Sequence, residues 1–190
     1  MIKVPKYNKE NRKKVVEKLP KGAYVCKILN IEAHQDKNGH EMVKICFDIA
    51  EGDYKDFYAT AYKANTNEDK KWSNDATYYL GIPYDGCPDY VSSNWDTFWA
   101  DVEDSNNGYV FDGNEKTVKG KVFGGLFHIE QTEYNGRIYD HTRLKWTKVA
   151  QDIRDGKVST MPKDKIIEEP LNPDDFVSVP PDAAEDLPWK

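Results

Sequence analysis

Apolar and polar residues alternate in five short segments of the chain, which are separated by stretches rich in Gly, Asn and Asp. The alternation is clearest in residues 41–50, where Val43, Ile45, Phe47 and Ile49 occupy every second position. This period of two predicts a β-strand with one buried face. The same criterion predicts five strands in all, at residues 22–33, 41–50, 54–63, 117–130 and 137–150.

The connections between these segments carry their own signals. Asn-Gly pairs at 38–39 and 135–136 predict two tight hairpin turns. Gly124-Gly125 interrupts the fourth segment and predicts a bulge or a sharp bend there. Residues 64–94 are polar, and we expect a loop with one helical turn near residues 75–80.

A helix is predicted after this loop. Trp95, Phe98, Trp99 and Val102 repeat at i, i+3, i+4 and i+7, which places them on one apolar face. Ser93 or Asn94 is the expected cap, and residues 106–108 (Asn-Asn-Gly) end the helix. We therefore assign the rings of Trp95, Phe98 and Trp99 to the core.

Three strands, a helix and two further strands follow the order of the five-stranded Greek-key barrel called the OB-fold. The predicted fold class is all-β with minor α: an OB-fold barrel with a helix between strands three and four. A β-sandwich and an open α+β sheet are the alternatives. We expect the barrel to span residues 22–160, between an arm (1–21) and a disordered tail (161–190).

The charge of the chain is concentrated at its two ends. Residues 1–21 hold eight Lys/Arg against two Glu, whereas residues 161–190 hold three Lys against eight Asp/Glu and six of the ten prolines. A tail of this composition cannot build a core of its own. The basic arm is read either as a solvated end or as a contact for phosphates.

Several functional classes find no support in the sequence. There is no apolar stretch long enough to cross a membrane, no secretory signal and no nucleotide-binding or hydrolase motif. The three cysteines are far apart, which suits a reducing compartment. We therefore expect a cytoplasmic protein, in a free-living cell or in a host cell, that is not an enzyme and needs no cofactor or metal.

Basic and aromatic residues are interleaved on the predicted strands, as single-strand binders require, because cations meet phosphates and rings stack on bases. The expected phosphate contacts are Lys27, Lys44, Lys119, Lys121, Arg137, Arg143 and Lys145. The expected stacking residues are Tyr58, Tyr62, Phe123 and Tyr139, with Trp72 in reserve. Ordinary solvent-facing strands carry the same residue types, so this pattern alone leaves both interpretations open.

The last residues of the tail are Glu185, Asp186, Leu187, Pro188, Trp189 and Lys190. This tip resembles that of bacterial and phage single-stranded DNA-binding proteins, whose acidic tails end in Pro-Phe. Here Trp189 replaces the Phe, and Lys190 follows it. Residues 19–24, 50–55 and 107–121 also resemble phage and prophage proteins of this kind.

The resemblance implies an OB-fold protein that coats single-stranded DNA during phage replication or recombination without sequence preference. It implies that residues 185–189 dock replication or recombination enzymes, and a homo-oligomer is compatible with this role. Two alternatives stay open. One is a metal-dependent nuclease that uses Asp96, Asp101, Glu103 and Asp104; the other is an acidic protein-interaction module, such as a DNA mimic.

Overall fold

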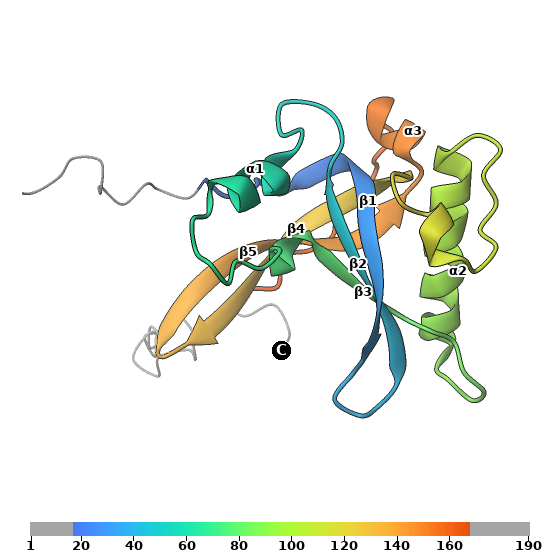
Figure 1. The fold of residues 1–190 in the computed structure, drawn as a ribbon, viewed down its shortest axis with the longest axis horizontal. Helices are drawn as coiled ribbons and strands as arrows, with labels where there is room; N and C mark the ends of the chain where they lie inside the picture. Colours follow the sequence, from blue (N-terminus) through green and yellow to red (C-terminus); the bar gives the residue numbers. More distant parts are fainter. Residues whose placement is uncertain (1–16, 168–190) are drawn as a thin grey trace, which may run out of the picture.

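Five antiparallel strands form one open sheet in the computed structural model, which describes residues 17–167 (Figure 1). They are β1 (Gly22–Gln35), β2 (Glu41–Ile49), β3 (Thr77–Gly81), β4 (Val122–Tyr134) and β5 (Arg137–Lys148). Their order across the sheet is β3-β2-β1-β4-β5, so β3 and β5 are the edge strands. The prediction of a mostly β protein with five strands is confirmed.

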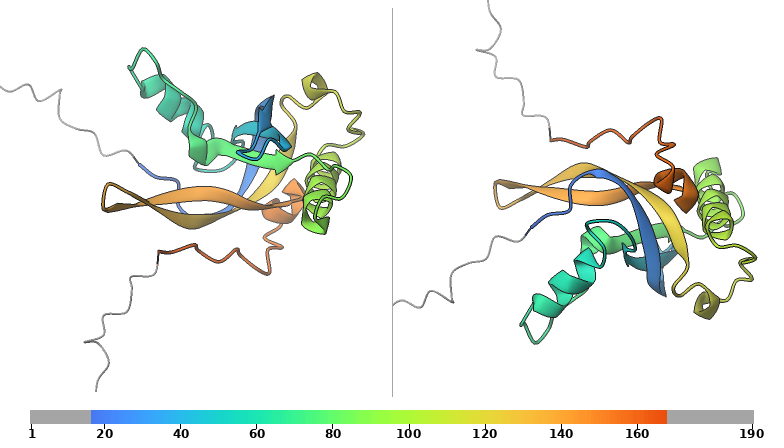
Figure 2. Two further views of the ribbon diagram at one scale, coloured as in Figure 1. Left: turned by 90° about the horizontal axis from the view of Figure 1, so that it is seen from below. Right: turned by 90° about the horizontal axis from the view of Figure 1, so that it is seen from above.

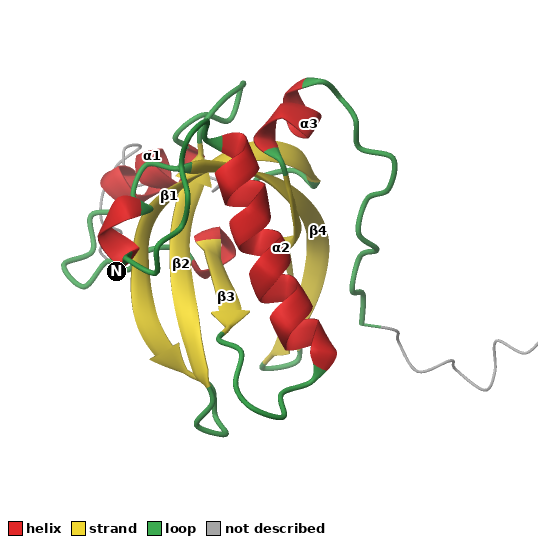
Figure 3. Cartoon of the chain, turned by 90° about the vertical axis from the view of Figure 1, so that its right-hand side faces the viewer, coloured by secondary structure: helices red, strands yellow, loops and turns green. Residues whose placement is uncertain are grey.

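Short helical elements connect the strands. They are α1 (Phe57–Ala64), α2 (Asp89–Ser105) and α3 (Ala150–Arg154), with 3-10 turns η2 (Asn74–Ala76) and η3 (Glu115–Thr117). Helix α2 lies between β3 and β4 in the chain and packs alongside both (Figure 3). It begins at Asp89, before the cap expected at Ser93 or Asn94. Its Phe98 and Trp99 are buried and Trp95 packs against them, as the helical spacing predicted.

The strand predicted at residues 54–63 is wrong, because most of this segment is helix α1. A carboxylate from another element explains the helix. Asp48, buried near the end of β2, accepts hydrogen bonds from the backbone N–H groups of Tyr58 and Ala59 at 3.0 and 2.9 Å. These donors lie in the first helical turn, where they have no partner within the helix. Asp48, which is distant in the chain, thus caps α1. The alternation of Tyr58, Thr60 and Tyr62 predicts a strand and gives no sign of this cap.

The third strand lies instead within the segment predicted to be loop. Residues 77–81 form β3, which follows η2 directly and pairs with residues 42–46 of β2. Tyr78 and Leu80 face the core, while Tyr79 between them is 42% exposed. The run is only five residues long and sits among polar neighbours, which hid its alternation.

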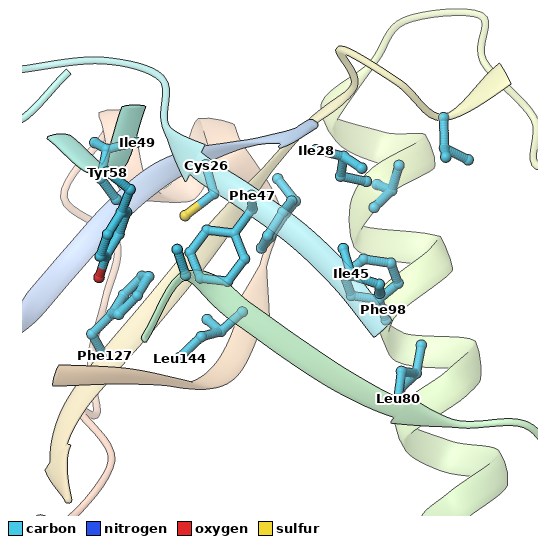
Figure 4. Close-up of a cluster of buried hydrophobic side chains, with 14 of the residues drawn as sticks. Cys26, Ile28, Ile45, Phe47, Ile49, Tyr58, Leu80, Phe98, Phe127 and Leu144 are labelled. Atoms are coloured by element: carbon cyan, nitrogen blue, oxygen red, sulfur yellow. The ribbon is translucent and has the colours of Figure 1, made fainter. Parts of the chain in front are cut away.

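Phenylalanines from separate elements meet in the core (Figure 4). The Phe47 ring contacts Phe123 and Phe127 edge-on at centroid distances of 6.0 and 5.8 Å, and Phe98 lies 5.5 Å from Phe123. Edge-to-face geometry of this kind is the favoured arrangement of packed rings. The core therefore ties β2, β4 and α2 together.

The glycine pair in β4 permits a close approach to neighbouring elements. A Cβ on Gly124 would lie 2.6 Å from Ile153 of α3 and 2.9 Å from the Lys148 carbonyl oxygen, and one on Gly125 would lie 2.9 Å from Leu144. The pairing of β4 with β5 shifts register immediately afterwards, between Leu126 and Phe127. The predicted irregularity is therefore present, one residue beyond the glycines.

Parts of the two predicted end segments pack on the sheet. Leu19 is buried in the core, and Lys165 forms a parallel bridge with Glu130 of β4. Figure 2 shows α1 on one side of the β4–β5 hairpin and the segment leading to residue 167 on the other. Residues 1–16 and 168–190, which include most of the arm and of the tail, lie outside the described residues.

Candidate nucleic-acid interface

One face of the β1–β2–β3 end of the sheet carries exposed polar and aromatic side chains. Cross-strand register places Glu32, Lys44 and Tyr79 side by side on this face, whereas Ile31, Ile45 and Tyr78 share the opposite face. The second set packs toward the core, where Tyr78 lies 5.9 Å from Phe98 of α2. Helix α2 therefore covers the inner face, and Lys44 and Tyr79 point away from it.

Lys44 keeps its positive charge on this face. Its Nζ lies 3.3 Å from a carboxylate oxygen of Glu32. Partial burial acts to lower the pKa of Lys44, but the hydrogen bond to Glu32 and the negative groups around it outweigh burial and raise the pKa. Lys44 is therefore a cation at neutral pH that stands beside the exposed ring of Tyr79.

Two histidine–tyrosine pairs lie at the free end of the β1–β2 hairpin. The ring centroids of His34 and Tyr79 are 5.0 Å apart, and those of His40 and Tyr84 are 5.1 Å apart and nearly parallel. Both tyrosines are more than 40% exposed. We call His34, His40, Lys44, Tyr79 and Tyr84 the ring face.

Asp36 holds the turn of this hairpin in shape. One of its oxygens accepts hydrogen bonds from the backbone N–H groups of Asn38 and His40, and the other lies 3.1 Å from His40 Nδ1. The backbone hydrogen bond from His40 is the main cause that lowers the pKa of the Asp36 carboxyl. The His40 ring is thus positioned from both sides, by Asp36 and by Tyr84.

The β4–β5 hairpin brings charges together but pairs them with one another. Arg143 lies 3.6 Å from Asp75 and 3.2 Å from Glu130, whose other oxygen lies 2.7 Å from Lys165. His141 bridges Asp75 and the Thr132 hydroxyl, with both contacts at 3.1 Å. Arg143 therefore belongs to a joint between η2, the hairpin and residue 165, which we call the charge joint.

The tip and the bulge of this hairpin remain accessible. Arg137 and Lys145 are exposed, Tyr139 is 43% exposed, and Tyr134, which pairs with Arg137, is 69% exposed. Arg137 and Tyr139 thus lie together at the tip, while Lys145 lies at the register shift nearer the core.

The remaining predicted cations are spread over other elements. Lys27 lies 3.7 Å from Asp56 before α1, and Lys121 stacks on the ring of Tyr109 at 4.3 Å. Lys119 is exposed and lines a shallow hollow with Asn30 and Ile31 of β1. The predicted phosphate contacts therefore do not form one continuous stripe.

The prediction that Phe123 and Tyr58 stack on bases is wrong, because both are buried. Phe123 is fully buried, because its register opposite Cys26 turns it into the core. Tyr58 is 6% exposed, because α1 turns it toward Phe47, and burial is the main cause that raises the pKa of its hydroxyl. Tyr62 is half-buried between Trp72 and Lys70.

Sequence reasoning missed Tyr79 and Tyr84 as candidate ligand contacts. The run Thr77-Tyr78-Tyr79-Leu80 consists largely of strand-forming residues, and its alternation could have identified Tyr79 as an outward ring. Nothing in the sequence indicates that Tyr84 stacks on His40, because that contact depends on the path of the loop after β3.

Two of the four carboxylates considered for a nuclease make structural hydrogen bonds, and the other two are exposed. Asp101 accepts a hydrogen bond from the Thr147 hydroxyl, and burial raises its pKa; Glu103 accepts one from the Phe111 backbone. Asp96 and Asp104 are exposed. Within residues 17–167, no three His, Cys, Asp or Glu side chains come together in a way that would hold a metal ion.

Two further predictions concern the end of the chain and its relation to membranes. The predicted docking peptide, residues 185–189, lies outside the described residues. In the described part of the chain, no helix is long and apolar enough to cross a membrane. Comparison with known proteins finds no matching family model and no matching curated protein.

Proposed function

We propose that this protein binds single-stranded DNA without sequence preference, through the ring face and the tip of the β4–β5 hairpin. The observation that carries the proposal is the group of exposed rings beside Lys44 on the outer side of β1–β3. Aromatic rings stack on any base, and each stacked base contributes roughly 1–3 kcal/mol. Lys44, Arg137 and Lys145 are the expected phosphate contacts.

The strand order supports the same function. In an OB-fold, oligonucleotides lie across the second and third strands between the loops that join strands 1–2 and 4–5. Here the sheet order is β3-β2-β1-β4-β5, and the β1–β2 and β4–β5 pairs are both long hairpins, which in this proposal flank the corresponding surface. We therefore treat the open sheet as an OB-type barrel in which η2 bridges the gap between β3 and β5; η2 contacts both β2 and β5.

The biological role proposed is that of a phage-type protein that coats strands exposed in replication or recombination. The resemblance of residues 19–24, 50–55 and 107–121 to such proteins supports this role. Recruitment of partner enzymes by residues 185–189 remains a prediction, as does a homo-oligomer.

Binding is tested by titrating the full chain into fluorescently labelled oligo-dT and following anisotropy at two salt concentrations. We expect affinity for the single strand to exceed that for a duplex of equal length. The logarithm of the affinity should fall by about 0.7 per neutralised phosphate for each tenfold rise in salt. An absence of binding to any single strand would overturn the proposal and favour the protein-interaction alternative.

Two substitutions locate the site. Tyr79→Ala should weaken binding by a factor of about 5 to 150, the equivalent of one lost stacking contact. Tyr90→Ala is the matched control, since Tyr90 is 66% exposed but belongs to α2, which covers the inner face. Equal affinities for the two variants would show that the strand binds elsewhere.

A further inference from the structure

The two histidines of the ring face are exposed and stand where the proposed DNA strand would pass. His34 shares the outward face of the sheet with Lys44 and Tyr79 because it pairs with Met42, two residues from Lys44. His40 lies beyond the start of β2, stacked on Tyr84, and its side chain is 49% exposed. Imidazole is the side chain whose charge changes near neutral pH.

The charged groups around the two rings differ. His34 has Tyr79 of β3 as its ring partner, and the nearest charges on its face are Glu32 of β1 and Lys44 of β2, which pair with each other. A carboxylate oxygen of Asp36 lies 3.1 Å from His40 Nδ1, and the ring of Tyr84 stacks on the His40 imidazole. A proton on His40 would therefore be partly balanced by Asp36, whereas no carboxylate in the described residues forms an ion pair with His34.

We infer that DNA binding is coupled to proton uptake by His34 and His40, so that affinity rises as the pH falls through the range in which histidine titrates. This inference rests on the proposed function. A phosphate close to an imidazole favours its charged form, and so does the face of a tyrosine ring. Because DNA raises the histidine pKa, protons and DNA bind cooperatively.

The direction and size of the effect follow from linkage. Each unit by which DNA raises a histidine pKa strengthens binding about tenfold at low pH relative to high pH. The gain is complete at low pH, where the histidines hold the proton with and without DNA, and it is lost as the pH rises far enough to remove the proton from the complex. His34 should contribute more than His40, because Asp36 already neutralises a His40 cation.

The test is the affinity of the full chain for labelled oligo-dT between about pH 8 and about pH 5.5 at constant ionic strength. Thymine is chosen because it has no group that titrates in this range. We expect affinity to increase about tenfold or more in the wild type and by less than about threefold in the double variant H34Q/H40Q. The single variant H34Q should lose more of the increase than H40Q.

Two further variants separate proton uptake from other effects. H34K/H40K carries permanent charges, so it should bind tightly at both ends of the range with a flat profile. H141Q removes a histidine of the charge joint, outside the ring face, and should keep the wild-type profile. A wild-type profile in H34Q/H40Q would overturn the inference while leaving DNA binding intact, whereas no binding at any pH would overturn the proposed function itself.

A second measurement does not depend on substitutions. The pKa values of His34 and His40 can be followed from their imidazole NMR signals with and without oligo-dT. The inference requires both pKa values to rise when DNA is added, His34 more than His40. Unchanged values in a saturated complex would overturn it.

Discussion

The two long hairpins of the sheet both alternate basic, aromatic and polar residues, yet they use these residues differently. The β1–β2 hairpin, with β3 beside it, presents exposed rings next to Lys44. In the β4–β5 hairpin, Arg143 is held between Asp75 and Glu130, and His141 bridges Asp75 and Thr132. Lys44 also has a carboxylate partner, but it is the single, half-exposed Glu32, whereas Arg143 is held between two less exposed carboxylates. The number and burial of the paired carboxylates therefore distinguish a cation open to a ligand from one held in the fold.

The two regions also differ in how their carboxylates stabilise the fold, since Asp48 is buried and Asp75 is partly exposed. The largest effect on stability is expected when Asp48 is removed. Asp48→Ala removes the carboxylate that accepts three backbone N–H groups, those of Ile49, Tyr58 and Ala59. Each buried donor left without a partner costs about 1–3 kcal/mol, so a loss of more than about 3 kcal/mol is expected. Asp75→Ala removes only half-exposed contacts of the charge joint and should cost about 1 kcal/mol.

Urea denaturation of both variants measures the two free energies of unfolding. Far-ultraviolet circular dichroism should in addition show a loss of helix in Asp48→Ala, because α1 loses its cap. Equal destabilisation of the two variants would contradict the contrast between a buried anchor and a surface joint.

A second prediction compares one glycine from each hairpin. Gly124→Ala places a Cβ against Ile153 and two backbone oxygens, so we expect a cost of about 2–3 kcal/mol from overpacking. Gly39→Ala meets open space but keeps a φ of +85°, which costs an L-residue about 1–2 kcal/mol. The midpoint of urea unfolding should therefore fall further for Gly124→Ala, and the opposite ranking would show that α3 can move away from β4.

Elements that depend on interactions between residues close in the chain were predicted correctly, whereas those that depend on distant residues were not. The strands β1, β2, β4 and β5 and the core face of α2 were predictable, because alternation, Asn-Gly turns and helical spacing are local signals. Helix α1 was not, because Asp48 caps it from another strand. Phe123 and Tyr58 were placed on the wrong face, since the facing of a strand or helix depends on its partners.

The candidate site was predictable only in part for the same reason. Lys44 and Tyr139 were identified and are accessible, and Arg137 lies at the hairpin tip. Arg143 was identified by its type, but its pairing with Asp75 depends on η2, which lies far away in the chain. Tyr79 was missed because β3 is short, and Tyr84 was missed because only the folded loop brings it to His40.

A third prediction compares two variants, one in each region, in which a cationic side chain is replaced by an uncharged one of similar length. Lys44→Met should weaken oligo-dT binding by up to about 1 kcal/mol, roughly fivefold, and change the free energy of unfolding by less than about 0.5 kcal/mol. Arg143→Met should do the reverse, with a stability loss of about 1 kcal/mol and an affinity within about twofold of wild type. Anisotropy titration and urea unfolding of both variants give the four values, and equal losses of affinity would place Arg143 in the interface.

The smallest expected effect concerns the stability of the fold at acidic pH. The hydrogen bond from Lys165 is the largest cause that lowers the pKa of the Glu130 carboxyl, and the positive charge of Arg143 adds to it. Because the pKa is lower in the folded chain than the unfolded value of about 4.3, this carboxylate stabilises the fold above that pH. The contribution is lost as the pH falls through the folded pKa, where both states hold the proton.

Glu130→Gln should therefore lower the free energy of unfolding by at most about 1 kcal/mol near neutral pH, and the difference from wild type should shrink to zero in acid. Glu32→Gln is the matched control from the other hairpin, because the Glu32 side chain is 51% exposed and pairs with only one lysine. Its effect should stay within about 0.5 kcal/mol. If urea unfolding at several pH values gave the same profile for both variants, the charge joint would stabilise the β4–β5 hairpin no more than an ordinary surface pair does, and Arg143 would be available to a ligand after all.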